Sequence, residues 1–372
     1  MLTTHVGSLP RPESVTPLLR DRESGARFDR VEFDTAMADA VRGVVAWQRD
    51  IGIDVVSDGE TSKITYSTYV KDRLTGFAGD TPRKPALDLA PYPELRQRMA
   101  AASGGGQAFA RQSCVGPVEY AGHDDLDADL AAMRAACDAA GVARGFLNAA
   151  SPGLVTAFQP NEHYATHEDY VRAVGAAMRT EYEAIVAAGF DVQLDCPDLA
   201  MARHTGFQAL TDDEFLERAE LHVDVLNEAT SGIDPARMRL HVCWGNYEGP
   251  HDHDVELGRI LPTVLRARPA TILFEAANPR HGHEWEVWSD ADIPDDKVLA
   301  PGTIMSTTNY VEHPRRVAQL LRPYVDLVGA ERVVASTDCG FGTFAGIGRV
   351  DPDVVRKKLT SLVEGAALAV AS

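Results

Sequence analysis

The 372-residue chain is 45% apolar and 24% charged, which provides enough hydrophobic material for a large core and excludes a disordered or fibrous protein. Its 36 Lys and Arg residues are outnumbered by 55 Asp and Glu, and the formal charge of -19 argues against nucleic acid or an anionic membrane as a partner. Without a run of apolar residues long enough to span a bilayer, and without a signal peptide, the sequence predicts a cytoplasmic protein. Its five cysteines are expected to be reduced.

Short β-branched runs alternate along the chain with Ala-rich and Leu-rich amphipathic stretches. Eight such runs are predicted strands: Thr3–Val6, Val55–Ser57, Leu154–Phe158, Val192–Leu194, Leu240–Trp244, Ile272–Phe274, Val298–Pro301 and Val333–Ser336. Helical patterns lie between most of them, and the clearest covers residues 167–190, where Gly189 supplies the stop. This alternation predicts one (β/α)8 TIM barrel domain over residues 1–372. The alternative, a doubly wound open sheet, lacks its dinucleotide-binding fingerprint after the first strand.

An insertion interrupts the barrel pattern after the second unit, at about residues 61–117. Much of it is rich in Pro and Arg, and it contains the low-complexity run Ser-Gly-Gly-Gly at residues 103–106. A β-like run at residues 109–115 indicates an edge hairpin inside the insertion rather than a ninth barrel strand.

Polar residues follow nearly every predicted strand at its carboxyl end. A buried parallel strand should be almost wholly apolar, so these residues require an explanation. In a barrel the strand ends converge on one mouth, where barrel enzymes hold their active sites. Glu60, Asp195 and Glu275 are poor helix caps or follow apolar strands, so we assign them to function rather than to capping.

The sharpest local motif is His241-Val242-Cys243. Residues two apart on a strand face the same side, so the imidazole and the thiolate can reach one ion. Glu275 follows the next strand, and Cys339 follows the last. One nitrogen, two sulfurs and one oxygen suit tetrahedral zinc, so we predict a zinc site at these four residues; the alternative is a core histidine beside inert buried cysteines.

Two His-X-His pairs lie in loops rich in Pro and Gly, without a cysteine partner. The first pair is His251 and His253, and the second is His281 and His283. We therefore expect them in solvated or substrate-facing loops rather than in a metal site.

Six segments of the chain occur in the order seen in a known family. They are HVGSLPRP, DVVSDGE, QLDCPDLA, HVCWGN, LFEA and STDCGFG, and together they span nearly the whole chain. The sequence thus resembles the catalytic carboxyl-terminal barrel of the cobalamin-independent methionine synthase family. The resemblance implies a zinc-dependent methyltransferase that methylates homocysteine from 5-methyltetrahydrofolate or another methyl donor, with His241, Cys243, Glu275 and Cys339 as zinc ligands.

The resemblance also implies a substrate site. Ser8, Glu60 and Asp195 would hold the amino-acid part of a thiol substrate, and Glu60 and Asp195 are the residues we assign to catalysis. Two carboxylates are natural partners for an ammonium group. A sulfonate thiol would instead need a basic residue, for which Arg11, after the first strand, is the nearest candidate.

The sequence departs from the family pattern at two places. No Trp stands in residues 154–159, where the family has one for pterin stacking, and Thr307 replaces the family's histidine acid. Two alternatives therefore stay open: thiol alkylation of the epoxyalkane:coenzyme M transferase type, and a non-catalytic zinc-binding or thiol-binding protein. The expected partners are a small-molecule thiol and an alkyl donor, and association into a homo-oligomer is left open.

Overall fold

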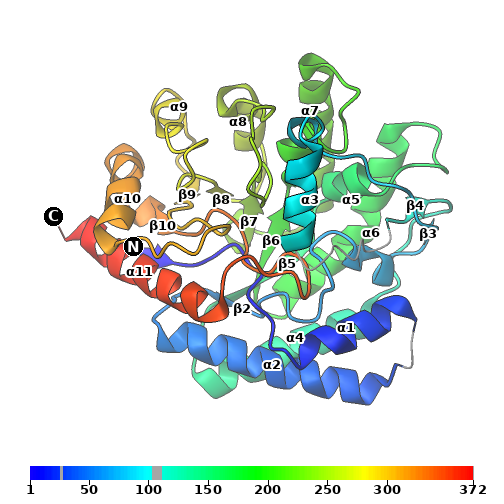
Figure 1. Ribbon diagram of the computed structural model, residues 1–372, viewed down its shortest axis with the longest axis horizontal. Coiled ribbons are helices and arrows are strands. Elements are labelled where there is room, and N and C mark those ends of the chain that lie inside the picture. Colours follow the sequence, from blue (N-terminus) through cyan, green and yellow to red (C-terminus); the bar gives the residue numbers. More distant parts are fainter. Residues whose placement is uncertain (26–27, 103–110, 372) are drawn as a thin grey trace.

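The computed structural model describes residues 1–25, 28–102 and 111–371. Within these residues eight parallel strands form the centre of the molecule, and helices surround them (Figure 1). The barrel strands are β1 (Leu2–Thr3), β2 (Val56–Ser57), β5 (Gly145–Ala150), β6 (Asp191–Asp195), β7 (Met238–His241), β8 (Thr271–Phe274), β9 (Val298–Pro301) and β10 (Val334–Ala335).

The strands close into a ring. Six of them pair in the order β2-β5-β6-β7-β8-β9, and β1 pairs with β10. Parallel bridges from Leu299 to Val333 and from Gly302 to Ser336 join the β9 and β10 segments. The amide of Val55 donates to the carbonyl oxygen of Thr3 at 3.1 Å, which joins β1 to β2. The predicted (β/α)8 barrel is confirmed, and the open-sheet alternative is wrong.

Helices cover the barrel, and most of them pack an apolar face inward, whereas α5 is buried almost throughout. They are α1 (Val15–Ser24), α2 (Arg30–Asp50), α4 (His123–Ala140), α5 (Pro152–Phe158), α6 (His167–Ala187), α7 (Asp212–Ala229), α8 (Leu257–Leu265), α9 (Trp285–Ser289), α10 (Pro314–Val328) and α11 (Pro352–Val370). The predicted helix at 167–190 is α6. Thr166 caps it by accepting from the Asp169 amide, and Gly189 has φ of 90° just beyond its end.

One predicted strand is wrong. Leu154–Phe158 belongs to helix α5, and the barrel strand at this point is the preceding segment, β5. The Ser151 side chain accepts from the Leu154 amide at 2.9 Å, and Pro152 occupies the first helical turn, so this local sequence starts a helix. Residues 152–157 are all buried, and their apolar run therefore lacks the periodicity that separates a helix from a buried strand.

The predicted insertion contains elements that lie outside the ring of eight strands. Strand β3 (Phe77–Ala78) pairs antiparallel with β4 (Ser113–Cys114), and helix α3 (Pro93–Ala102) lies between them in the sequence. The expected edge pairing is thus confirmed at residues 113–114. Residues 109–110 of the same predicted run lie outside the described residues, as does the low-complexity run at 103–106.

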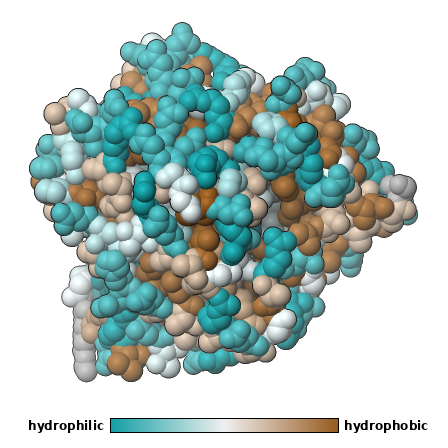
Figure 2. Space-filling model, turned by 180° about the vertical axis from the view of Figure 1, so that it is seen from behind, coloured by the Kyte–Doolittle hydropathy of each residue, from teal (hydrophilic) through white to brown (hydrophobic). Residues whose placement is uncertain are grey.

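Hydrophilic residues predominate on the face of the molecule shown in Figure 2, and hydrophobic residues occur there in scattered groups. None of the described helices combines the length and apolar character needed to cross a bilayer.

Candidate metal centre and substrate cavity

Three predicted ligands meet at the carboxyl ends of the strands. His241 ends β7, Cys243 follows it by two residues, and Cys339 lies just beyond β10. All three are buried, and their donor atoms lie within 4.8 Å of one another. The two sulfurs are 3.9 Å apart. Two zinc–sulfur bonds of ~2.3 Å at a tetrahedral angle place the sulfurs roughly 3.8 Å apart, so the spacing fits one metal ion.

Asp195 orients the imidazole of His241. Nδ1 of His241 lies 3.3 Å from Oδ1 of Asp195, whereas Nε2 is buried and has no hydrogen-bond partner in the described part of the chain. The carboxylate is itself held by Asn148 and Gln193, whose side-chain amides each donate to it at 3.0 Å. A carboxylate on Nδ1 keeps the proton there and leaves the Nε2 lone pair free for a metal.

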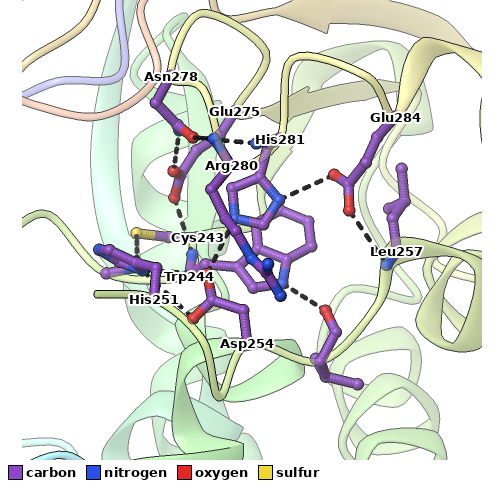
Figure 3. Close-up of polar contacts among 12 residues, drawn as sticks. Cys243, Trp244, His251, Asp254, Leu257, Glu275, Asn278, Arg280, His281 and Glu284 are labelled. Carbon is purple, nitrogen blue, oxygen red and sulfur yellow. Dashed lines mark hydrogen bonds and ion pairs between the residues drawn. The ribbon is translucent and has the colours of Figure 1, made fainter. Parts of the chain in front are cut away.

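The fourth predicted ligand, Glu275, stands beside this cluster without joining it. Its Oε1 accepts from the Trp244 amide at 2.8 Å, and its Oε2 accepts from Nδ2 of Asn278 at 2.7 Å (Figure 3). Asp338 fixes the loop by accepting from the backbone amides of residues 276–278 at 2.9 to 3.0 Å. Burial and the nearby Glu275 charge raise the pKa of Asp338 to about 7.

The surroundings of the cluster disfavour the thiolate form of Cys243 in the absence of a cation. The hydrogen bond with Cys339, burial and the Glu275 charge together raise the pKa of the Cys243 thiol. The amide of Gly245 donates to the Cys243 sulfur at 3.3 Å, which partly offsets this effect. A bound cation would stabilise both thiolates, so the chemistry of the donor set, like its spacing, fits a metal.

The cluster opens on a cavity of about 470 Å³. Its lining includes three of the four predicted substrate residues, Ser8, Glu60 and Asp195. It also includes side chains that sequence reasoning missed, namely Tyr66, Arg83, Phe158, Met201, Phe341, Phe344 and Arg349. Tyr66 and Arg83 come from the insertion. No strand-end signal marked this segment, so its contribution to the site depends on how it folds back over the barrel mouth.

Arg11 is not part of the cavity lining. Its guanidinium donates to the backbone carbonyls of Glu60, Lys63 and Gly342 at 2.7, 2.6 and 2.5 Å. The structure therefore places this predicted substrate residue behind the site, where it joins the loops after β2 and β10.

Glu60 is held in an unusual conformation. Its φ is 54°, a left-handed value that is uncommon for a residue with a side chain. Its Oε2 is buried without a hydrogen-bond partner among the described residues. Burial and the Asp195 charge raise its pKa to about 8. A strained acid with an unsatisfied oxygen in the cavity is the arrangement expected of a group that binds a ligand.

A second cavity of about 290 Å³ adjoins the first at Cys339. It shares Asn246, Tyr247, Ser306 and Cys339 with the first cavity, and it adds Glu275, Thr307 and His251. In each His-X-His pair the first histidine is at least partly buried and the second is exposed. His251 is partly buried and lines this cavity, and His281 is buried, whereas His253 and His283 are exposed.

The class of protein follows from these features: a (β/α)8 barrel with a buried His-Cys-Cys cluster of metal-ligating type at its mouth. Residues 1–83 match the family described as cobalamin-independent synthase, catalytic domain. A methionine synthase from Saccharolobus solfataricus is 23% identical over 369 residues, which cover 98% of this chain and 93% of that protein. The methionine synthase of Sulfolobus acidocaldarius is also 23% identical, covering 98% of this chain and 90% of that one.

Two solved structures share the fold over nearly their whole length. A B12-independent methionine synthase from Shewanella sp. W3-18-1, in complex with selenomethionine, has a TM-score of 0.72 at 21% identity, covering 98% of this chain and 96% of that one. A putative vitamin-B12 independent methionine synthase from Listeria monocytogenes has a TM-score of 0.69 at 16% identity, covering 100% and 98%. The predicted resemblance to the cobalamin-independent methionine synthase family is confirmed.

Proposed function

We propose that this protein is a zinc-dependent methyltransferase whose acceptor is the thiol of homocysteine. The observation that carries the proposal is that one cavity contains both the cluster of His241, Cys243 and Cys339 and the acids Glu60 and Asp195. The first group suits a thiol and the second suits an ammonium, and homocysteine carries both. The relatives named methionine synthase support the same reading.

Nε2 of His241 and the two cysteine sulfurs would hold the zinc, and Glu275 would be its exchangeable fourth ligand. When bound, zinc lowers the pKa of a substrate thiol and keeps the sulfur nucleophilic near neutral pH. Glu275 is suited to exchange because the Trp244 amide and the Asn278 side-chain amide already donate hydrogen bonds to its carboxylate oxygens when it is not a ligand. The displaced carboxylate would therefore not be left unsatisfied.

The acids of the cavity would bind the amino group of homocysteine. The pKa of Glu60, raised by burial and by the Asp195 charge although Lys63 and Arg11 act against it, means that this carboxyl carries a proton near neutral pH. An arriving ammonium would favour the carboxylate form and supply the missing partner of Oε2. This contact would fix the thiol of the same molecule toward the cluster and help align its sulfur in line with the methyl carbon.

A second candidate is thiol alkylation with a sulfonate thiol such as coenzyme M. The observation in its favour is that Arg83 and Arg349 line the first cavity and form no ion pair within the described residues. Guanidinium groups suit a sulfonate, which Glu60 and Asp195 would repel. The relatives named methionine synthase and the buried Oε2 of Glu60, which lacks a partner among the described residues, favour an amino-thiol, so we rank homocysteine first.

The test is metal analysis of the purified protein followed by assays with two thiols. Homocysteine and coenzyme M are each supplied with 5-methyltetrahydrofolate, methylcobalamin or epoxypropane. We expect about one zinc per chain and methionine as a product. Turnover of coenzyme M alone would favour the second candidate. Binding of thiols without turnover of any donor would indicate a non-catalytic zinc or thiol-binding protein.

A further inference from the structure

Three aromatic side chains from separate segments line the first cavity. Tyr66 belongs to the insertion, Phe158 is the last residue of α5, and Phe344 lies in the loop after β10. The Tyr66 ring is inclined at 79° to that of Phe158 and at 86° to that of Phe344, with centroids 6.0 and 6.1 Å apart. All three side chains remain partly exposed. Perpendicular rings that line one cavity can present ring faces to a ligand from more than one side, and we call these three residues the aromatic cage.

The aromatic cage lies near both the cysteine sulfurs and a guanidinium. Burial raises the pKa of the Tyr66 hydroxyl, the charges of Cys243 and Cys339 raise it further, and the charge of Arg83 acts to lower it. Such charge effects weaken with distance, so the sulfurs and Arg83 are both close to Tyr66. All four side chains line the same cavity. A ligand in the cage would therefore be close to the cluster and to a positive charge.

The surroundings of the cage favour a cation without N–H groups. The faces of aromatic rings carry negative potential, and cages of such rings bind onium groups, which are weakly hydrated cations. The acids Glu60 and Asp195 line the same cavity, and the formal charge of the chain is -19. A primary ammonium gains more from the two acids, because it can donate hydrogen bonds to them. A sulfonium or quaternary ammonium has no such donor, so it gains more from the rings.

The described residues of this cavity offer little acid for a leaving group. Burial raises the pKa of the Tyr66 and Tyr247 hydroxyls, so both are weak proton donors. His241 belongs to the ligand cluster, and Glu60 becomes a carboxylate once an ammonium faces it. An amine or alkoxide leaving group needs a proton as it departs. A donor whose leaving group departs neutral and unprotonated therefore fits this cavity better.

We propose that the alkyl donor is a small sulfonium or quaternary ammonium compound that also carries a carboxylate. The aromatic cage holds the onium centre, and Arg83, which forms no ion pair within the described residues, holds the carboxylate. This inference rests on the proposed function for its acceptor and adds the chemical class of the donor. A cavity of about 470 Å³ has the size of a site for one drug-sized ligand, so two small molecules can share it.

The transfer balances without a further reactant. The thiol of homocysteine releases its proton to solvent when it binds as a thiolate. Its sulfur then forms a bond to the methyl carbon with its own electron pair. The bond from that carbon to the positive sulfur or nitrogen breaks, and its electron pair stays on the departing atom, which becomes a neutral sulfide or tertiary amine. One negative and one positive charge are lost together, and a cavity lined by aromatic rings disfavours that loss less than water does.

The experiment adds onium donors to the donor set of the functional assay. Dimethylsulfoniopropionate and S-methylmethionine are sulfonium carboxylates, trimethylglycine is an ammonium carboxylate, and trimethylsulfonium has no carboxylate. Methyl iodide is the neutral control, since iodide leaves without a proton. We expect methionine from at least one onium carboxylate, at a higher kcat/KM than from trimethylsulfonium, 5-methyltetrahydrofolate, methylcobalamin or epoxypropane. The more reactive onium carboxylate identifies the leaving atom as sulfur or nitrogen.

Two variants test the two parts of the donor site. Phe158→Leu keeps an apolar side chain but removes a cage ring, so kcat/KM for the onium donor should fall about 10- to 30-fold. Arg83→Gln should raise the KM of the onium carboxylate about 10- to 100-fold and leave that of trimethylsulfonium unchanged. In both variants the methyl iodide rate, the KM of homocysteine and the zinc content should stay at the parent's values. Phe207→Leu is the matched control, because Phe207 is a partly buried ring that packs on His167 outside the cavity lining.

The outcomes separate this inference from the proposed function. A parent that methylates homocysteine from methyl iodide or 5-methyltetrahydrofolate, but from none of the onium compounds, would overturn the donor class and leave the proposed function standing. Equal losses with methyl iodide and with the onium donor in Phe158→Leu would also overturn it. A parent that methylates homocysteine from no donor at all would overturn the proposed function itself.

Discussion

The side chains of the candidate metal centre depend on one another for their chemistry. His241 is a suitable ligand because Asp195 holds its proton on Nδ1, and Asp195 is held in turn by two buried amides. Cys243 and Cys339 are separated by nearly a hundred residues in the sequence, and their sulfurs meet only in the folded barrel. The metal site is therefore a property of the closed mouth and not of one segment.

Replacing Cys339 by Ala should abolish most zinc binding, because the remaining His241 and Cys243 offer one nitrogen and one sulfur. Zinc per chain is measured after dialysis by atomic emission. Cys137→Ala is the control, since Cys137 is a buried cysteine on the outer helix α4. Full zinc content in the Cys339 variant would show that the cluster is not the site.

Substitution of the two cavity acids, Asp195 and Glu60, should have different effects on zinc affinity. Asp195→Asn weakens the charge that orients His241, so we expect zinc affinity to fall by about 10- to 100-fold. Within the described residues Glu60 forms no hydrogen bond with the cluster, so Glu60→Gln should retain zinc. Competition with a chromophoric chelator measures both constants. Equal zinc affinities in the two variants would contradict the role of Asp195 as the partner of His241.

Glu60 should release a proton when homocysteine binds. Its pKa of about 8 means that the carboxyl is mostly protonated at pH 7, and an ammonium beside it lowers that pKa. Calorimetry in buffers of different ionisation enthalpy measures the protons released. We expect Glu60→Gln to release about one fewer proton than the parent and to bind homocysteine at least about tenfold more weakly.

The sequence predicts the candidate metal ligands better than it predicts the residues that orient them. The spacing of His241 and Cys243 was sufficient to predict a shared side on a strand. The role of Asp195 could not be predicted in this way, because it depends on the register that sets Asp195 opposite His241 in neighbouring strands. The hydrogen bonds that hold Glu275 away from the cluster likewise come from another strand end and its own loop.

At the scale of elements, the loops after β7 and β8 are joined by a buried charge network. His281 donates from Nε2 to Asp254 and from Nδ1 to Glu284, each at 3.0 Å (Figure 3). Its ring also packs on Trp244, with centroids 4.4 Å apart. Glu284 further accepts from the Leu257 amide at 3.3 Å, at the start of α8. The network therefore connects the segment that carries Cys243 to the helix that follows.

The network should make stability depend on pH. Although burial opposes it, bonding to Asp254 and Glu284 raises the pKa of His281 from 6.5 to about 10. The resulting stabilisation is complete below pH 6.5 and is lost as the pH rises toward about 10. We therefore expect the unfolding free energy of the parent, measured with urea, to be lower at about pH 9 than at about pH 6. This difference between the two pH values should be smaller in His281→Gln. His283→Gln, at the exposed position, should behave like the parent.

The sequence predicts the type of an element correctly where apolar and polar residues alternate with a helical or strand period. It does not do so where every residue of the element is buried. Helix α6 has one apolar face, so its pattern sets it apart from a strand. Strand β5 contains the polar Asn148 in a buried position, and the neighbouring α5 is apolar almost throughout. Only the helix cap at Ser151 marks where strand β5 ends and helix α5 begins. The position of that cap depends on contacts outside the segment, including the hydrogen bond that the Ser151 hydroxyl donates to Asp198 at 2.7 Å.

For the whole molecule, β1 is the element that completes the ring. It pairs with β10 on one side and is joined to β2 on the other. Inside the barrel, Arg239 donates to the Thr4 hydroxyl and to the His5 carbonyl oxygen, both at 3.0 Å, and its guanidinium lies over the Phe146 ring. The first strand is therefore held by the opposite wall as well as by its neighbours.

Deleting residues 1–6 should abolish the cooperative thermal transition, because β2 and β10 would lose their shared partner and Arg239 its acceptors. Circular dichroism on heating measures the transition. Deletion of the last two residues, which follow α11, is the control and should leave the midpoint unchanged. A truncated protein that still melts cooperatively at the parent's midpoint would contradict this account of closure.

The pairing of the first strand with the last has a consequence for biosynthesis. While the chain leaves the ribosome, β1 stays unpaired on one side until β10 has been synthesised, and Cys339 follows β10 in the sequence. A nascent chain can form the βα units in between, but it cannot offer the second sulfur or a closed wall until roughly the final tenth of the protein has emerged. A metal ion can therefore bind all three residues only at the end of synthesis. A chain that terminates before β10 would have an open barrel, with His241 and Cys243 present and Cys339 missing.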